Sequence, residues 1–337
     1  MSFPRRQKLL CLLCQWRSFS TSYRRLAKEA EKAAPKPTST INPAPSPSPQ
    51  KFIPPSPLED APRGYGKRVE KFTPVPLPRP IGLPYPPEAG QNTGVDNRSI
   101  RQRRDDFVNW DKHLVRREQL KTQFRKPYFR DWTNLEHHKG KTFISPPRPF
   151  KADLSLWFPN LFGTTLSKTD KGPHDTTPVL AGKVTVVSVF SGQWAEGQAA
   201  SFVSAEANPE LQAALREHAG RGAQHVRVNI EEDKLKGFLI RLFTGSIRRA
   251  VPEADWGRYF VVRRGLSDEV KEAIGMLNGK VGYVYLVDSE CRLRWAGSGY
   301  AEGHERVGLV TALLRLLDEE KSAKKAKLPG SPATARQ

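Results

Sequence analysis

The three cysteines are the side chains of this 337-residue chain with the widest range of possible chemistry. Cys11 and Cys14 form a C-x-x-C pair, a spacing that suits disulfide exchange or metal binding. The pair lies, however, in RRQKLLCLLCQWRSFSTSYRR, which is rich in arginine and serine and has no acidic residue. This composition is typical of an amphipathic organelle-targeting peptide, and we predict that residues 1–26 are a mitochondrial transit peptide. The mature chain would then keep Cys291 alone.

The other reactive side chains form no recognisable catalytic or metal-binding set. Cys291 is a candidate redox thiol beside a turn, but we favour its interpretation as a small apolar residue at a hairpin edge. The seven histidines are scattered, and no Cys/His spacing matches zinc or copper ligation. The run GSGYAEG lacks the lysine and the spacing of a phosphate-binding loop. We therefore expect no catalytic residue, no cofactor and no metal.

Hydrophobic periodicity predicts the elements that would position a site. β-Branched and apolar runs predict strands at residues 184–190, 224–230 and 259–263, with helices between them. The clearest helical stripe runs from Leu235 to Ile247, and Asn208 with Pro209 should start a shorter helix. VGYVYLVD and RLRWAG predict a hairpin, and ERVGLVTALLRLLDEE predicts a final helix. This order of elements is that of an α/β, thioredoxin-like (peroxiredoxin-like) domain.

The first of these strands ends where such a domain carries its reactive thiols, at the N-terminus of a helix whose dipole stabilises a thiolate. Here Ala195 and Gln198 occupy the two expected cysteine positions. The hairpin is preceded by GKVGYVY, without the proline that usually faces the thiol. In the hairpin we expect Leu293 and Trp295 to point inward and Arg292 and Arg294 outward. The loss of both redox features argues against an oxidoreductase.

Composition divides the chain into five parts. Only 37% of the residues are apolar, and the 29 prolines concentrate before residue 90. We expect a disordered proline-rich linker at residues 27–95, the thioredoxin-like domain at 142–320 and a disordered tail at 321–337. Within that domain, the aromatic run at 142–167 should form an extended lead-in to the first core strand. No stretch is long and apolar enough to span a bilayer, so any membrane association should be peripheral.

The remaining part, residues 96–141, is predicted to be a basic helical arm. Between Arg98 and Arg130 there are eleven Lys/Arg residues and four Asp/Glu residues, and Asn97 or Asp96 could cap the helix. An apolar stripe is expected at Ile100, Phe107, Val108, Leu114 and Val115. The arm either binds an anionic membrane or a partner helix, or packs its stripe on the following domain, and the sequence leaves both open.

Several long blocks resemble a known family. FRDWTNLEHH, RPFKADLSLWFPNLFG, TTPVLAGKVTVVSVFSGQWAEGQAASF and GYVYLVDSECRLRWAGSG are similar to the fungal mitochondrial assembly factors that act on the Fo sector of the F-type ATP synthase, the tenth-numbered ATPase assembly protein family. The similarity extends from about Phe129 to Leu317. It implies a non-enzymatic chaperone on the matrix side of the inner membrane that binds newly made Fo subunit a, the proton-channel subunit, and promotes its assembly with the c-ring.

This resemblance transfers no catalytic residue, and it suggests where a client could bind. We expect a vacant cleft at the former redox position, with client contacts on the loop from Ser191 to Glu196 and on the aromatic lead-in. The candidate client-binding residues are Trp157, Phe158, Ser191, Gln193, Trp194 and Glu196. Each aromatic residue could instead simply pack the core. The net charge of +20 suits an anionic inner-membrane surface as a second partner.

The sequence leaves two other functions open. One is a thioredoxin-like redox or peroxidase protein that uses Cys291. The other is a basic protein associated with the mitochondrial ribosome or RNA, although no aromatic RNA-reading motif is present and we expect no nucleic-acid partner.

Overall fold

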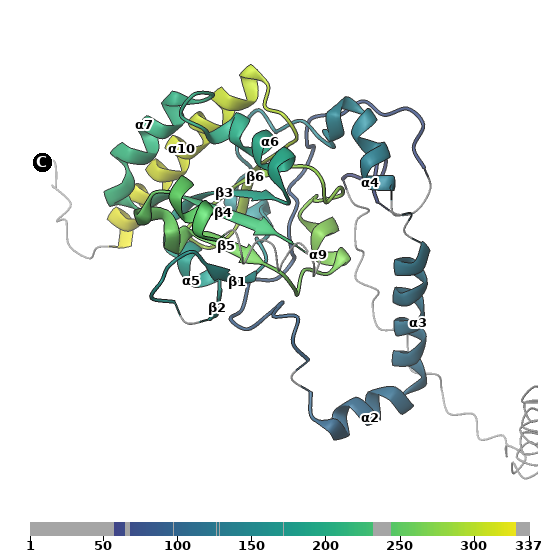
Figure 1. Cartoon of the computed structure of the whole chain (residues 1–337). Helices are drawn as coiled ribbons and strands as arrows, with labels where there is room; N and C mark the ends of the chain where they lie inside the picture. The colour runs from purple at the N-terminus through teal and green to yellow at the C-terminus, as the bar shows by residue number, and fades with distance from the viewer. Residues whose placement is uncertain are drawn as a thin grey trace, which may run out of the picture. The chain divides into compact units, whose positions relative to one another are not determined.

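A computed structural model describes residues 57–64, 68–96, 98–125, 127, 129–170, 172–231 and 244–327 (Figure 1). The chain divides into two units, Met1–Pro54 and Pro55–Gln337, and all the described residues belong to the second. The predicted transit peptide, residues 1–26, lies outside the described residues. Most of the predicted stripe from Leu235 to Ile247 does so too, although residues 244–250 are helical.

Four strands form the centre of a mixed sheet. Strand β3 (Val184–Phe190) pairs in parallel with β4 (Ala223–Ile230) and antiparallel with β6 (Tyr283–Val287), which pairs antiparallel with β7 (Leu293–Ser298). All seven residues of β3 are buried, as their β-branched composition predicts for a strand covered on both faces. The resulting order, β4-β3-β6-β7 with β6 antiparallel to the rest, is that of the thioredoxin fold, which confirms the predicted fold class.

Three further strands widen the sheet beyond β4. Strand β5 (Tyr259–Val262), which the apolar sequence predicts as a strand, runs parallel to β4. Strands β1 (Phe162–Thr165) and β2 (Pro173–Asp175) then add in antiparallel fashion, so that the full order is β2-β1-β5-β4-β3-β6-β7.

Three helices cover one face of the sheet, as Figure 1 shows. They are α6 (Gln193–Val203), α7 (Pro209–Glu217) and α10 (Gly303–Lys327). The Asn208 side chain caps α7, as predicted, by accepting a hydrogen bond from the N–H of Leu211. The α10 helix continues through residues 321–327, so the prediction of a disordered tail was wrong there. Residues 328–337 lie outside the described residues.

The opposite face is covered by short helices and by residues from the proline-rich region. The helices are α5 (Thr177–Leu180) and α9 (Asp268–Ala273), the latter capped by Ser267 as predicted. Between residues 57 and 95, side chains that we assigned to a disordered linker are buried in the core: Leu58, Ala61, Leu77, Ile81 and Leu83. That prediction was wrong for the described part of the region, because its apolar residues complete a core that the short helices leave open.

The lead-in runs beside β7 and covers its edge, as we expected of an extended segment. The N–H of Phe158 donates to the carbonyl of Cys291 at 2.8 Å, and the N–H of Leu293 donates to the carbonyl of Leu156 at 2.7 Å. A short 3₁₀ helix, η3 (Ala152–Leu154), interrupts the segment. The backbone groups of an outer strand are thereby satisfied within the chain.

The structure corrects the orientation of one hairpin residue. Arg294 was predicted to point outward, yet it is buried, and its guanidinium lies 3.3 Å from Asp288 and 2.8 Å from Glu319. It also donates to the carbonyl of Phe150 at 2.6 Å. Both faces of β7 are covered, and three acceptors satisfy the buried cation.

The predicted basic arm contains two helices rather than one. Helix α2 (Ile100–Val108) ends at Asn109, and α3 (Trp110–Arg125) follows directly. The cap of α2 is Ser99, which forms a capping box with Gln102, so the expected cap at Asp96 was wrong, and Asn97 lies outside the described residues. Short helices follow in the chain: α4 (Arg130–Thr133), η1 (Asn134–Glu136) and η2 (His138–Gly140); η4 (Ala219–Arg221) and η5 (Glu253–Arg258) occur within the domain.

Across the described residues, no helix is long and apolar enough to cross a membrane.

Candidate functional site

The candidate site lies at the N-terminus of α6, where the turn after β3 reaches the surface. Gly192 precedes the helix with a φ of +88°, a conformation that glycine adopts without strain. Gln193 and Glu196 are exposed, whereas Trp194 and Ser191 are half-buried. The Ser191 hydroxyl donates a hydrogen bond to the carbonyl oxygen of Gly279, which joins this turn to the segment before β6.

The two positions that would carry redox cysteines are fully buried. Ala195 and Gln198 each have 0% of their surface exposed. The amide oxygen of Gln198 accepts a hydrogen bond from the N–H of Gly282 at 2.8 Å, and its amide nitrogen donates to the carbonyl of Lys139 at 2.9 Å. Gln198 therefore fills the former thiol position and is hydrogen-bonded to segments on both sides of it.

The segment before β6 approaches α6 so closely that only glycine fits at residue 282. A Cβ atom there would lie 2.1 Å from the carbonyl oxygen of Ala195. Gly282, which stands where thioredoxin-like enzymes usually have a proline, thus allows the hairpin to pack tightly against α6.

Around this filled position, aromatic rings and lysine side chains reach the surface together, some exposed and some half-buried. Trp194 packs on Tyr300 with ring centroids 5.7 Å apart, and the Lys139 ammonium lies 5.6 Å from the Tyr300 ring centre. Next to Gly279, which Ser191 contacts, the Lys280 ammonium lies 5.7 Å from the ring centre of Trp132, which is 53% exposed. We call this set the α6 surface; its members are Trp132, Lys139, Ser191, Gln193, Trp194, Glu196, Lys280 and Tyr300. Exposed rings with adjacent cations suit the docking of a peptide segment.

A buried ion pair holds one edge of the α6 surface in place. The ammonium of Lys141 lies 2.6 Å from the Glu305 carboxylate and donates to the carbonyl of Tyr300 at 2.9 Å. The same carboxylate accepts the N–H groups of Ser145 and Glu302. Sequence reasoning missed this cluster, because a lysine and a glutamate 164 residues apart give no local signal.

The aromatic candidates on the lead-in are placed elsewhere. Phe158 is 1% exposed and packs against Tyr285 in the core, which makes it a structural residue. Trp157 is half-buried, exchanges backbone hydrogen bonds with Leu83 and lies against the guanidinium of Arg292 at 5.5 Å. Arg292, which contacts Trp157, comes after the last residue of β6, whereas Gly282, which packs on α6, comes just before its first residue. The structure therefore does not bring Trp157 or Phe158 to the α6 surface.

Cys291 has the environment of an inert thiol. It is 3% exposed, lies in the core cluster, and burial beside the Asp288 carboxylate raises its pKa to about 11. A protonated, inaccessible thiol neither attacks a disulfide nor reduces a peroxide. This environment does not support the redox alternative and agrees with the preferred interpretation of Cys291 as a small apolar residue.

A serine and a histidine that sequence reasoning missed also lie together on the helix-covered face. The hydroxyl of Ser188 and the Nε2 of His225 are 2.9 Å apart. Burial is the main cause that lowers the pKa of His225 to about 3, and the nearby Arg227 and Arg258 lower it further. Because Ser188 is buried in the middle of β3, this pair stabilises the sheet rather than forming an accessible nucleophile and base.

No group of three or more His, Cys, Asp or Glu side chains suited to a metal ion occurs among the described residues.

Comparison with known proteins gives one matching family. The model of the ATP10 protein family matches residues 66–316. The chain is 34% identical to the mitochondrial ATPase complex subunit ATP10 of Eremothecium gossypii over 227 residues, which cover 67% of this chain and 79% of that protein. It is 29% identical to the Saccharomyces cerevisiae protein of the same name over 248 residues, 71% of this chain and 86% of that protein.

Similar solved structures include a secreted thiol-disulfide isomerase from Corynebacterium glutamicum, with 13% identity and a TM-score of 0.34 over 53% of this chain and 99% of that one. A thioredoxin-family thiol:disulfide interchange protein from Chlorobium tepidum has 15% identity and a TM-score of 0.28, and covers 48% of this chain and 97% of that one.

Proposed function

Since the chain belongs to the ATP10 protein family, we propose that it is a non-enzymatic assembly factor of the mitochondrial ATP synthase. In this proposal it binds newly made Fo subunit a, the proton-channel subunit, and promotes the assembly of that subunit with the c-ring. The protein acts from the matrix side of the inner membrane, to which it associates peripherally.

The observation that carries this proposal is the environment of Gln198. Its amide groups hold the N–H of Gly282 and the carbonyl of Lys139 where a redox enzyme of this fold would keep an accessible thiol. The thioredoxin frame is thus retained and its reactive position is filled by structural hydrogen bonds. A thioredoxin-like fold that lacks a reactive thiol is better suited to binding a partner than to catalysing a redox reaction.

The α6 surface supplies the binding chemistry. Trp132 and Tyr300 expose 53% and 43% of their surfaces, and each has a lysine ammonium over its ring. A newly made membrane protein presents apolar side chains and polar loop ends together. Aromatic rings can cover the apolar side chains, and lysine ammonium groups can pair with carboxylates or carbonyls of the polar loop ends. We therefore assign client contact to the α6 surface rather than to the lead-in.

Native gels of mitochondria that lack the protein test the proposal. We expect the catalytic F1 head to form normally, while the Fo sector is depleted of subunit a and the c-ring accumulates without it. Reintroduction of the unchanged chain should restore the complete enzyme. A normal amount of inhibitor-sensitive ATP synthase in the absence of the protein would contradict an assembly role.

The same gels can separate binding from folding. A Trp194→Ser/Tyr300→Ser variant removes the two packed rings of the α6 surface, and a Val307→Ser variant removes an exposed apolar side chain of α10 outside that set. We expect only the first to lower subunit a incorporation, with both variants present at normal amounts. Equal incorporation in the two would argue against the α6 surface.

A further inference from the structure

We propose that helices α2 and α3 form a lipid-binding arm that lies flat on an anionic bilayer, with apolar side chains in the interface and arginines on the phosphates. We call residues 98–121 the α2–α3 arm. The inference rests on the peripheral membrane location in the proposed function and adds the segment that binds the membrane. It does not depend on which client the α6 surface binds.

The first observation is a concentration of exposed large apolar side chains. Ile100, Phe107 and Val108 on α2 expose 85%, 76% and 74% of their surfaces, and Trp110 at the start of α3 exposes 68%. Leu114, Val115 and Leu120 on α3 are exposed as well. These residues include the whole predicted stripe, and no described part of the domain covers it. Such a density of exposed apolar residues marks an interaction surface.

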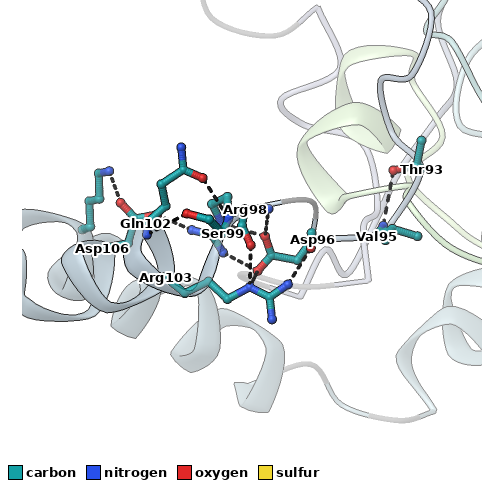
Figure 2. Close-up of polar contacts among 9 residues, drawn as sticks. Thr93, Val95, Asp96, Arg98, Ser99, Gln102, Arg103 and Asp106 are labelled. Atoms are coloured by element: carbon teal, nitrogen blue, oxygen red, sulfur yellow. Dashed lines mark hydrogen bonds and ion pairs between the residues drawn. The ribbon is translucent and has the colours of Figure 1, made fainter.

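The second observation is that the acidic residues near the start of the arm are largely occupied by local cations. Figure 2 shows Arg98 between two carboxylates, with 2.8 Å to Asp96 and 2.5 Å to Asp106. Lys112 of α3 also pairs with Asp106, across the junction between the helices. Arg103 donates to the backbone carbonyl of Asp96 at 2.6 Å. These contacts fix α2 and its junction with α3, and they neutralise part of the acidic charge.

The third observation is a set of arginines that this network leaves available. Arg101, Arg104, Arg116 and Arg117 are exposed, and within the described part of the chain none of them pairs with a carboxylate. The α2–α3 arm contains eight Lys/Arg and four Asp/Glu, an excess of four positive charges. The arm therefore carries the charge that complements anionic headgroups.

The combination of exposed apolar side chains and available arginines favours lipid over nucleic acid. Nucleic acid would use the arginines but leave Ile100, Phe107 and Val108 exposed to water. A bilayer interface accommodates both sets, because acyl chains receive the apolar side chains while long arginine side chains reach the phosphates. Trp110 is also of the type that is enriched in the headgroup region.

Vesicle flotation with the purified full chain tests this inference. The vesicles are phosphatidylcholine alone or phosphatidylcholine with about one fifth phosphatidylglycerol. An apolar variant carries Ile100→Ser, Phe107→Ser and Trp110→Ser, and a charge variant carries Arg→Gln at residues 101, 104, 116 and 117. Matched controls change exposed residues of the domain: Val75→Ser, Leu154→Ser and Val307→Ser for the first, and Arg→Gln at 216, 221, 263 and 264 for the second. Circular dichroism verifies that every variant is folded.

We expect the unchanged chain to float with anionic vesicles and not with neutral ones. Each arm variant should lose at least tenfold in partition coefficient, whereas each control should change less than threefold. Equal binding of arm variants and unchanged chain, or equal loss in the controls, would overturn the inference. Another result would also overturn it: arm variants that still bind vesicles but no longer crosslink to subunit a or to RNA in mitochondria. The arm would then contact a macromolecule instead of lipid. Failure of flotation alone leaves the assembly role standing, since that role is tested by native gels.

Discussion

The amide oxygen of Gln198 accepts a hydrogen bond of 2.8 Å from the N–H of Gly282, at the position where a thioredoxin-like enzyme would hold a cysteine. Both groups are buried, and the Gln198 amide nitrogen satisfies a second segment through Lys139. Gln198, which stands where a redox enzyme of this fold has a cysteine, therefore connects α6 to two other segments of the domain.

Replacement of this residue should cost stability. Gln198→Ala removes two hydrogen bonds and leaves the buried N–H of Gly282 without a partner, and we expect a loss of about 2–3 kcal/mol in the free energy of unfolding. Urea denaturation measures it. Gln193→Ala on the exposed side of the same helix is the control and should change stability by less than about 0.5 kcal/mol. Equal effects in the two variants would show that the bridge is unimportant.

The buried pair of Lys141 and Glu305 should behave as a coupled unit. Lys141→Met leaves the Glu305 carboxylate buried without its cation, for an expected loss of about 3 kcal/mol. The double variant Lys141→Met/Glu305→Gln should recover part of that loss, because no uncompensated charge remains. Arg258→Ala, which breaks the partly exposed pair with Asp255, should cost less than about 1 kcal/mol. Simple additivity of the two buried substitutions would contradict the coupling.

Cys291 should resist alkylation in the folded protein. With its pKa raised to about 11, only about one thiol in a thousand is ionised at pH 8, and its burial excludes reagent. Iodoacetamide labelling of a Cys11→Ser/Cys14→Ser chain should be slow at pH 8 and become fast only on unfolding in urea. Rapid labelling of the folded chain near neutral pH would revive a redox role.

His225 should make the protein less stable in mild acid. Its pKa is lowered to about 3 in the folded state, whereas an unfolded histidine has a pKa near 6.5, so between these values the unfolded chain binds the extra proton. Stability should therefore fall as the pH drops from 7 to 5, by about 2 kcal/mol from this residue alone. His225→Gln, which can still bond Ser188 but does not titrate, should lose less over that range. His304→Gln, at an exposed position, should follow the unchanged chain.

The central sheet could be predicted because each of its strands has a recognisable local sequence pattern. Val184–Phe190 and Tyr283–Val287 consist mainly of β-branched and aromatic residues, and a short run that is mostly apolar on both faces fits a covered strand. Local signals also placed the caps at Ser267 and Asn208. These features depend on neighbouring residues, which a single sequence shows directly.

The errors arose where distant residues decide the outcome. Arg294 is buried because Asp288, Glu319 and the Phe150 carbonyl meet around it, and alternation along the strand could not show these partners. Leu77 and Ile81 enter the core although their proline-rich surroundings suggest disorder. Their apolar side chains among the prolines were the available signal. The closure of the site by Gln198 likewise depends on Lys139, 59 residues earlier in the chain.

Site-specific photocrosslinking during mitochondrial translation tests the central claim most directly. A photoreactive residue at Gln193 places the probe on the exposed α6 surface, and one at Arg221 places it before β4, at the other end of the sheet. With newly made mitochondrial products labelled, we predict a crosslink from position 193 to subunit a and little or none from position 221. The absence of labelled subunit a from position 193, in a folded and correctly located protein, would contradict the account.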